Sequence, residues 1–297
     1  MEEAIFINHS TCKKCMLCVE VCSNKILTKN ESGEISFKPE RKDLCFICGQ
    51  CMAICETKSI FINGYSYEKD FFELPEYEQG SLEKPFYNLI YTRRAVRNFK
   101  DKPVPKELLE KIVDAISFAP PGFPPVKTKI LVVSNPEIIR QSLPHMINLY
   151  DKLLQMMKKP IFRYFISKEV GSKKFKTMNK HLVPLLKARM SAVKAGNEDP
   201  FTRNAPAMIL FLADKNGEDI SQDISIAATY GMLASHSLGL GGSIMDIIPP
   251  AINKSPELRK MYNISDEQDV ITSIIIGYPK YKYRKGIKRE LKEVRWV

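Results

Sequence analysis

Eight cysteines, all within the first 55 residues of a 297-residue chain, constrain this sequence more than any other feature. They form two runs with the same spacing, C-x-x-C-x-x-C-x-x-x-C. The first run is Cys12, Cys15, Cys18 and Cys22, and the second is Cys45, Cys48, Cys51 and Cys55. A tight loop can present a thiolate at every third residue, so three cysteines of one run can converge on one site. Such a segment leaves little room for a hydrophobic core, so we expect the group held by the thiolates to stabilise its fold.

The spacing within each run is that of thiolate ligands to a [4Fe–4S] cluster, and here it occurs twice. In chains with two such clusters, the fourth cysteine of each run ligates the other cluster. We therefore assign one cluster to Cys12, Cys15, Cys18 and Cys55, and the second to Cys45, Cys48, Cys51 and Cys22. Such runs often end in Cys-Pro, whereas Ser23 and Glu56 follow here. Local hydrogen bonds at these positions would affect the reduction potential.

Zinc and disulfides are the alternative uses of these cysteines. A zinc site would need only two C-x-x-C pairs and would leave half of the cysteines unused. Disulfides suit a small secreted scaffold, but the N-terminus Met-Glu-Glu-Ala lacks the basic region of an export signal. No apolar run approaches the length of a membrane span. We therefore expect a cytoplasmic protein with no membrane partner.

The cysteine runs predict a two-[4Fe–4S] ferredoxin domain at residues 1–62. The apolar triplets at residues 5–7 and 60–62 are expected to pair as its first and last strands, and residues 34–37 to form a hairpin edge. Residues 63–84 are predicted to be an acidic linker, because they hold Asn-Gly, proline and many acids without a clear period. Residues 85–297 carry a net charge of about +15, so the excess of positive charge behind the +11 of the whole chain lies in this part.

Residues 85–297 alternate between helical and strand patterns, which indicates an α+β or α/β architecture. Apolar residues at helical spacing predict a helix over residues 105–119, with Pro105 in its first turn. Strands are predicted at residues 129–133, 208–212 and 270–276. A helix at residues 224–238 carries few charges on any side, so we expect it to be buried all round. Residues 137–195 form a basic helical insertion, but nothing in the chain resembles a nucleic-acid-binding module.

Three stretches of the larger domain could carry chemistry. Residues 93–99 hold three arginines within five positions, which suits phosphate binding but is also typical of a solvated basic patch. Residues 119–125 form a rigid proline-rich loop that, taken alone, is only a stiff connector. Residues 239–243 are glycine-rich, and glycines allow a ligand to approach the backbone. They follow a helix rather than a strand, so they are not a Rossmann fingerprint.

Together and in this order, these stretches resemble the nitroreductase family of FMN enzymes over about residues 88–297. The likeness also includes Val104-Pro105-x-Glu107-Leu108-Leu109, Asn204-Ala205-Pro206 and Ile276-Gly277-Tyr278-Pro279. The resemblance implies an α+β fold and a tight homodimer with one FMN at each of two interface sites. With the cysteine runs, the whole chain looks like a ferredoxin–nitroreductase fusion.

The resemblance also implies which residues bind FMN. Arg93, Arg94 and Arg97 would hold the phosphate and the pyrimidine edge, and Ala95 stands where the family often has serine. The other implied contacts are Pro121 and Gly122 from the partner subunit, Gly241, Gly242 and Ser243 near the isoalloxazine, and Lys282 and Arg284 at the phosphate. Pro124 and Val126 stand about where many relatives carry asparagine and glutamine, which implies a more apolar pocket mouth.

The combination predicts an oxidoreductase in which electrons pass from the clusters to FMN and then to a nitro compound, quinone, enone or similar acceptor. The donor would be an external ferredoxin or NAD(P)H. Two alternatives are an electron-transfer flavoprotein that serves a protein partner and a flavin-modifying or dehalogenating enzyme on the same fold. No catalytic acid or base can be identified, because His9, His145, His181 and His236 are scattered.

Overall fold

The computed structural model describes residues 5–122 and 128–297, which divide into two compact units. The first unit holds residues 5–81, and the second holds residues 82–122 and 128–297. Residues 1–4 and 123–127 lie outside the described residues, so the expectation for Pro124 and Val126 lies outside them as well. No helix of the described ranges is both long enough and apolar enough to cross a membrane.

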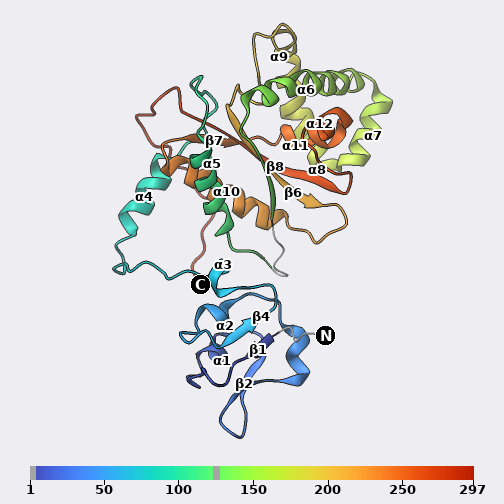
Figure 1. Cartoon of the computed structure of the whole chain (residues 1–297). Helices are drawn as coiled ribbons and strands as arrows, with labels where there is room; N and C mark the ends of the chain where they lie inside the picture. The colour runs from blue at the N-terminus through green and yellow to red at the C-terminus, as the bar shows by residue number, and fades with distance from the viewer. Residues whose placement is uncertain (1–4, 123–127) are drawn as a thin grey trace. The chain divides into compact units, whose positions relative to one another are not determined.

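The first unit is built from two small antiparallel sheets (Figure 1). Strand β1 (Ile5–Ile7) pairs with β4 (Ile60–Ile62), which confirms the predicted pairing of the two apolar triplets. Strand β2 (Leu27–Lys29) pairs with β3 (Ile35–Phe37), so the predicted hairpin edge has a partner that the sequence pattern missed. The helices of this unit are short: α1 (Leu17–Val21), the 3₁₀ helix η1 (Pro39–Leu44), α2 (Gln50–Ala53) and α3 (Tyr67–Asp70).

The two cysteine runs fold alike. Met16 and Gly49 take the left-handed conformation before α1 and α2, with φ of 70° and 75°. Lys25 and Lys58 take it after the fourth cysteine of each run, both with φ of 51°. Positive φ is uncommon for residues other than glycine, so its recurrence at matching places shows that the unit is an internal repeat.

The beginning of the predicted linker packs into the first unit. Tyr67 is buried, and its hydroxyl donates a hydrogen bond to the Ile60 carbonyl oxygen at 2.8 Å. Ser66 caps helix α3 by accepting a hydrogen bond from the Glu68 amide, as serine commonly does at a helix N-terminus. The core around Tyr67 consists mainly of Ile5, Ile7, Cys18, Leu27, Ile35, Met52, Ile60 and Ile62.

The second unit is an α+β domain around a four-stranded antiparallel sheet with the order β5-β6-β8-β7. Strands β5 (Lys129–Val133), β6 (Ala207–Asp214) and β8 (Gln268–Gly277) confirm the three predicted strands. Strand β7 (Gly241–Ile244) was not predicted, because glycine is depleted in strands and the segment does not alternate. It forms here because its backbone pairs with β8 along the edge of the sheet.

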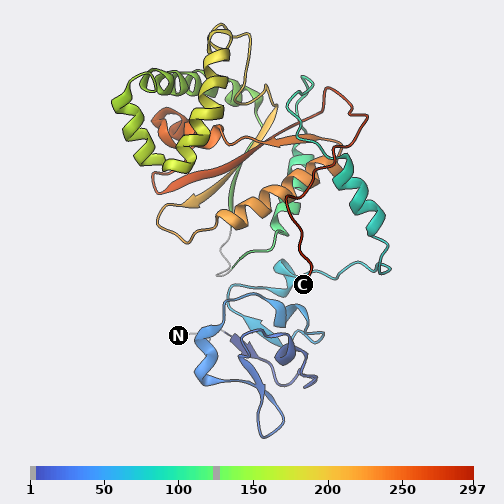
Figure 2. The ribbon, with the colours of Figure 1, turned by 180° about the vertical axis from the view of Figure 1, so that it is seen from behind.

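Helices cover both faces of this sheet (Figures 1 and 2). Ile274 and Ile275 are neighbours on β8, so their side chains point to opposite faces. Ile274 packs under Gly231 of α10 (Ser221–Ser237), and Ile275 joins the core around α11 (Ile248–Lys254). Helix α5 (Lys106–Ser117) packs on α10, with Pro105 as its N-cap residue rather than inside its first turn.

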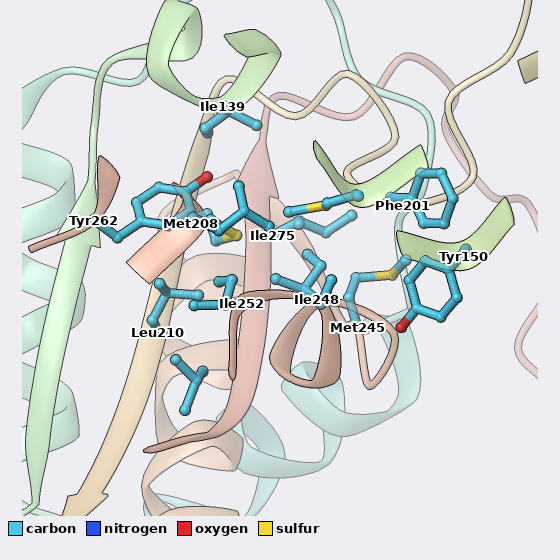
Figure 3. Packing of buried hydrophobic residues seen from close by; sticks show 14 of the residues in the cluster. Ile139, Tyr150, Phe201, Met208, Leu210, Met245, Ile248, Ile252, Tyr262 and Ile275 are labelled. Atoms are coloured by element: carbon cyan, nitrogen blue, oxygen red, sulfur yellow. The ribbon is translucent and has the colours of Figure 1, made fainter. Parts of the chain in front are cut away.

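The other face of the sheet carries the basic helical segment. Its elements are α6 (Pro136–Met156), α7 (Pro160–Val170), α8 (Ser172–Thr177), the π-helical turn η2 (Met178–Leu182) and α9 (Val183–Lys194). Helix α6 contacts α9, α11 and α12 (Pro256–Met261), and the second unit begins with α4 (Glu83–Thr92). Figure 3 shows Ile139, Met208, Leu210, Ile248, Ile252 and Ile275 packed together in this core.

Helix α10 departs from its prediction. Ile226 and Tyr230 are each 38% exposed, so the expectation that this helix is buried on all sides is wrong for the single chain. Its buried face consists of small residues together with Ile224 and Met232, and the helix packs on the sheet and on α5. The exposed face therefore carries apolar side chains that a single chain leaves in contact with water.

Candidate functional site

The arginine-rich stretch lies beside strand β7. The Val96 amide donates to the Gly242 carbonyl oxygen at 2.9 Å, and Ala95 and Gly242 form a parallel bridge. The structure therefore places residues 93–97 next to Gly241, Gly242 and Ser243, which are far away in the sequence. Seven of the predicted FMN-binding positions are brought to one edge of the sheet in this way.

The chain after β8 returns along the same stretch. Phe99 and Pro279 form an antiparallel bridge, and the Lys280 amide donates to the Asn98 carbonyl oxygen at 3.0 Å. Further along, the Arg94 guanidinium donates to the Lys285 carbonyl oxygen at 3.4 Å. Lys282 and Arg284 lie between these two contacts. The arginines of residues 93–97, near the start of the domain, and Lys282 and Arg284, near its end, therefore lie on chain segments that run beside each other.

Gly241 and Gly277 permit this arrangement through their lack of a side chain. A Cβ atom on Gly241 would lie 2.7 Å from the Cβ of Val96, and one on Gly277 would lie 2.6 Å from the Cδ of Pro206. Real side chains do not approach so closely, so the backbones would have to separate. Both glycines are therefore required where residues 93–99 close onto the β7–β8 pair.

Replacing Gly241 by alanine is expected to displace the arginine stretch. The overpacking should cost about 1–3 kcal/mol of unfolding free energy and lower the retention of flavin during purification. Thermal unfolding and a released-flavin assay would measure both effects. Gly239→Ala is the matched control. Alanine is strained at the φ of +76° of Gly239 and should also lower stability, but its Cβ meets open space and displaces no neighbour, so flavin should be retained. Equal flavin loss in both variants would contradict the close approach at Val96.

Positive charge gathers at the N-terminal end of this stretch. His236, near the end of α10, lies 2.8 Å from the Thr92 hydroxyl through Nε2. That hydroxyl donates its one hydrogen to the Asn88 carbonyl oxygen at 2.6 Å, so His236 Nε2 is the donor. Burial, together with the charges of Arg93 and Arg94, lowers the pKa of His236. The site therefore repels a further proton and favours an anion.

The side chain of Arg94 offers a hydrogen-bond donor to an anionic ligand. Its Nε atom is buried and has no hydrogen-bond partner within the described part of the chain. A buried guanidinium nitrogen without a partner is costly, and phosphate and carboxylate oxygens are its strongest acceptors. The residues present at this edge therefore fit a phosphate-bearing ligand.

Arg203 is a second cation that the sequence pattern missed. It directly precedes Asn204-Ala205-Pro206, and its Nε is also buried without a partner among the residues described. Burial, with the charges of Arg189 and Arg97, lowers the pKa of Arg203. Its position before the recognised motif is the only sequence signal that could have identified it.

A rigid loop holds Arg203 in its left-handed conformation, with φ of 58°. The Asp199 carboxylate accepts hydrogen bonds from the Phe201, Thr202 and Asn204 amides at 2.8–2.9 Å. Phe201 is fully buried and stacks on Tyr150, with ring centroids 5.2 Å apart. Figure 3 shows this pair at the edge of the core. Asp199 therefore stabilises the turn that precedes Asn204-Ala205-Pro206.

Pro121 and Gly122 do not join this edge within one chain. The Gly122 amide donates to the Asp223 carboxylate at 2.9 Å, in the first turn of α10. His236 lies near the other end of that helix, about 20 Å away at 1.5 Å per residue. The expectation that Pro121 and Gly122 serve the site of a partner subunit stays a prediction.

In the first unit, the cysteines line two hollows in the sets that the spacing predicts. One hollow is lined by Cys12, Cys15, Cys18 and Cys55 together with apolar side chains such as Ile7. The other is lined by Cys22, Cys45, Cys48 and Cys51, again with apolar neighbours. Within residues 5–122 and 128–297, no group of three or more His, Cys, Asp or Glu is placed to hold a metal ion. The four cysteines of each set line one hollow.

The thiols within each set influence one another. Burial and the charges of Cys55, Cys15 and Cys12 raise the pKa of Cys18 to about 11. Burial and the charges of Cys48, Cys45 and Cys22 raise the pKa of Cys51 to about 12. Such thiols hold their protons at neutral pH unless a cationic group takes up the thiolates, so loading either hollow would release protons.

Comparison with known proteins identifies the second unit. The family model described as "Nitroreductase family" matches residues 90–278. A putative NADH dehydrogenase/NAD(P)H nitroreductase of Methanothermobacter thermautotrophicus is 25% identical over 194 residues, which are 64% of this chain and 75% of that protein. Iodotyrosine deiodinase 1 of Rattus norvegicus is 24% identical over 214 residues, 69% of this chain and 66% of that protein. The chain thus spans just under two thirds of the rat protein's length.

A solved structure shares the fold of the second unit. The nitroreductase with bound FMN from Bacteroides fragilis NCTC 9343 superposes with a TM-score of 0.52 at 17% identity, covering 71% of this chain and 97% of that one. This likeness confirms the predicted nitroreductase-like α+β fold.

Proposed function

The chain belongs to the nitroreductase family, and on that premise we propose that it is an FMN-dependent reductase supplied with electrons by two [4Fe–4S] clusters. Electrons would leave to an organic acceptor such as a nitro compound, a quinone or an enone. The observation that carries this proposal is the presence, in one chain, of two four-cysteine hollows and of an arginine-lined edge in a nitroreductase fold.

FMN would be held at the edge where residues 93–97 meet β7. Arg93, Arg94 and Arg97, with Lys282 and Arg284 from the returning chain, would bind its phosphate and pyrimidine edge, and the unpartnered Arg94 Nε supports this assignment. Ala95, Gly241, Gly242 and Ser243 would contact it through the backbone. Bound FMN supplies two-electron chemistry to the site, and the guanidinium groups stabilise negative charge there.

The two hollows of the first unit would each hold one [4Fe–4S] cluster through four thiolates. The agreement between the hollows and the two cysteine sets supports the crossed assignment of Cys22 and Cys55. Each cluster supplies one-electron chemistry, so two of them can provide the electron pair that a flavin needs. An external ferredoxin would reduce the clusters one electron at a time, whereas NAD(P)H as the donor would transfer its hydride directly to the FMN.

A homodimer is part of the proposal. None of the residues of α4 is buried, and its Phe86, Tyr87 and Tyr91 are 44–62% exposed. Helix α4 contacts α10, whose Ile226 and Tyr230 are also exposed. Exposed apolar side chains on two helices in contact fit a second copy of the chain, which would also bring Pro121 and Gly122 to the neighbouring site. Sedimentation should give about twice 34.0 kDa, and a flavin-loaded single chain would contradict the proposal.

Reductive dehalogenation is a second candidate, favoured by the similarity to proteins named iodotyrosine deiodinase. Product analysis separates it from nitro reduction, because halide is released only in dehalogenation. An electron-transfer flavoprotein that serves a protein partner would reduce neither kind of small acceptor.

Anaerobic purification followed by iron, released-flavin and turnover assays tests the proposal. We expect about eight irons and about one FMN per chain, since each cubane holds four irons. Turnover of a nitroaromatic with a reduced ferredoxin or NAD(P)H as donor would support the reductase. Iron near zero, or a chain without flavin, would overturn the proposed function.

A further inference from the structure

The backbone surroundings of the two crossing cysteines are alike. The Ile26 amide donates to the Cys22 sulfur at 3.5 Å, and the Ser59 amide donates to the Cys55 sulfur at 3.2 Å. In both runs a left-handed lysine follows, and its amide donates to the carbonyl oxygen of the same cysteine at 3.0 Å. Each sulfur thus accepts a hydrogen bond from the amide four residues further on, and the side chains around the two sulfurs differ.

Only the second run places hydroxyl groups at its crossing cysteine, among the contacts of the described residues. The Thr57 hydroxyl lies 3.7 Å from the Cys55 sulfur and 2.7 Å from the Ser59 hydroxyl. The Ser59 hydroxyl, which is fully buried, lies 2.9 Å from the Thr11 hydroxyl. At the position that matches Thr57, Asn24 directs its amide to the Leu44 carbonyl oxygen at 2.6 Å.

An ionised Cys55 sulfur fixes the direction of this hydroxyl chain. A thiolate can only accept, so Thr57 donates to it and Ser59 donates to Thr57. Thr11 then donates to the Ser59 hydroxyl at 2.9 Å in preference to the Asn8 carbonyl oxygen at 3.3 Å. Each hydroxyl then uses its single hydrogen once, and successive donors strengthen one another. The three hydroxyls thus deliver one aligned set of dipoles to a single sulfur.

The two hollows are alike in being lined mainly by apolar side chains besides the cysteines. Lys13 also lines the Cys55 hollow, but it is paired with Glu56 at 3.0 Å. Among the contacts of the described residues, the hydroxyl chain therefore distinguishes the Cys55 sulfur from the Cys22 sulfur.

We propose that Cys12, Cys15, Cys18 and Cys55 hold the cluster of higher reduction potential, and that the Thr11–Ser59–Thr57 hydroxyl chain sets this order. The inference rests on the proposed function, since it requires that both hollows are loaded. Hydrogen bonds to the cysteine sulfur withdraw electron density and stabilise the more negative reduced state. The first electron from a one-electron reductant would therefore reside at the Cys55 set, and the second would enter the Cys22 set.

A potentiometric titration of the anaerobically purified full chain, followed by electron paramagnetic resonance, tests this order. With dithionite as the reductant, the unaltered chain should show two one-electron steps at separate potentials. Thr57→Val keeps the shape of the side chain and removes the hydroxyl, so only the higher step should move to lower potential. A tenfold change in the equilibrium between the two sets, about 59 mV for one electron, is the expected scale.

The controls separate a redox role from a structural one. Thr28→Val makes the same exchange where the hydroxyl contacts only the Lys29 carbonyl oxygen, and it should leave both steps unchanged. Thr57→Ser should restore the higher step, and Ser59→Ala offers a second variant if Thr57→Val does not load iron. Loaded variants with an unmoved higher step, or a shift of the lower step, would overturn this inference alone. A chain without iron would overturn the proposed function as well.

Discussion

Removing iron from the loaded protein with a chelator is expected to unfold the first unit and to leave the second unit folded. The strands of the first unit have three residues each, and its buried core is small. Metal binding in such small domains contributes on the order of 10 kcal/mol of folding free energy, which this core cannot replace. The second unit has its own extensive core around β6 and β8. Hydrogen exchange should therefore show lost protection at Ile5, Ile35 and Ile60, and retained protection at Leu210 and Ile275.

The flavin provides the control for this experiment. Chelation should not release FMN, because none of its proposed ligands lies in the first unit. Retained amide protection at Ile60 in iron-free protein would contradict the view that the clusters stabilise this unit. Loss of protection in both units at once would contradict their independent stability.

Arg94→Met is expected to weaken FMN binding about 10–100-fold. Hydrogen bonds to charged groups contribute about 1.5–3 kcal/mol each, and the buried Arg94 Nε is available for one. The loss should appear as a higher dissociation constant in a fluorescence titration with FMN. Riboflavin lacks the phosphate, so its affinity should be nearly the same in the variant and the unaltered protein.

Arg140→Met is the matched control for that substitution. Arg140 lies on the exposed surface of α6, where it pairs with Glu137 at 2.9 Å. Its loss should change FMN affinity by less than about twofold, because exposed ion pairs contribute little. Equal losses for FMN and riboflavin in Arg94→Met would show that Arg94 does not bind the phosphate.

The sequence predicted most of what depends on local spacing. The cysteine spacing predicted the two four-cysteine sets. It could do so because residues with positive φ occur at the same positions relative to the cysteines in both runs. Helix α5 and the strands β5, β6 and β8 follow apolar patterns that burial imposes directly. The family resemblance supplied the arginines and the glycines that meet at the edge of the sheet.

What the sequence could not supply depends on pairing between distant segments. Strand β7 exists because its backbone pairs with β8, which no local pattern of Gly241 and Gly242 reveals. Arg203 became a candidate only when its buried Nε was seen without a partner. The hydroxyl chain at Cys55 likewise joins Thr11 to Ser59 across the first unit. The prediction that α10 is buried on all sides was wrong, because Ile226 and Tyr230 are exposed to water in the single chain.

In the proposed function, electrons held by the clusters at the two cysteine sets pass to the flavin and from there to the acceptor. The most direct measurement reduces the full chain anaerobically, removes the reductant, mixes it with a nitroaromatic and follows the absorbance in a stopped-flow instrument. The iron–sulfur absorbance and the flavin absorbance should return together, with Cys→Ala variants of either set delivering fewer electrons per chain. Flavin absorbance that returns while the iron–sulfur centres stay reduced would contradict the account.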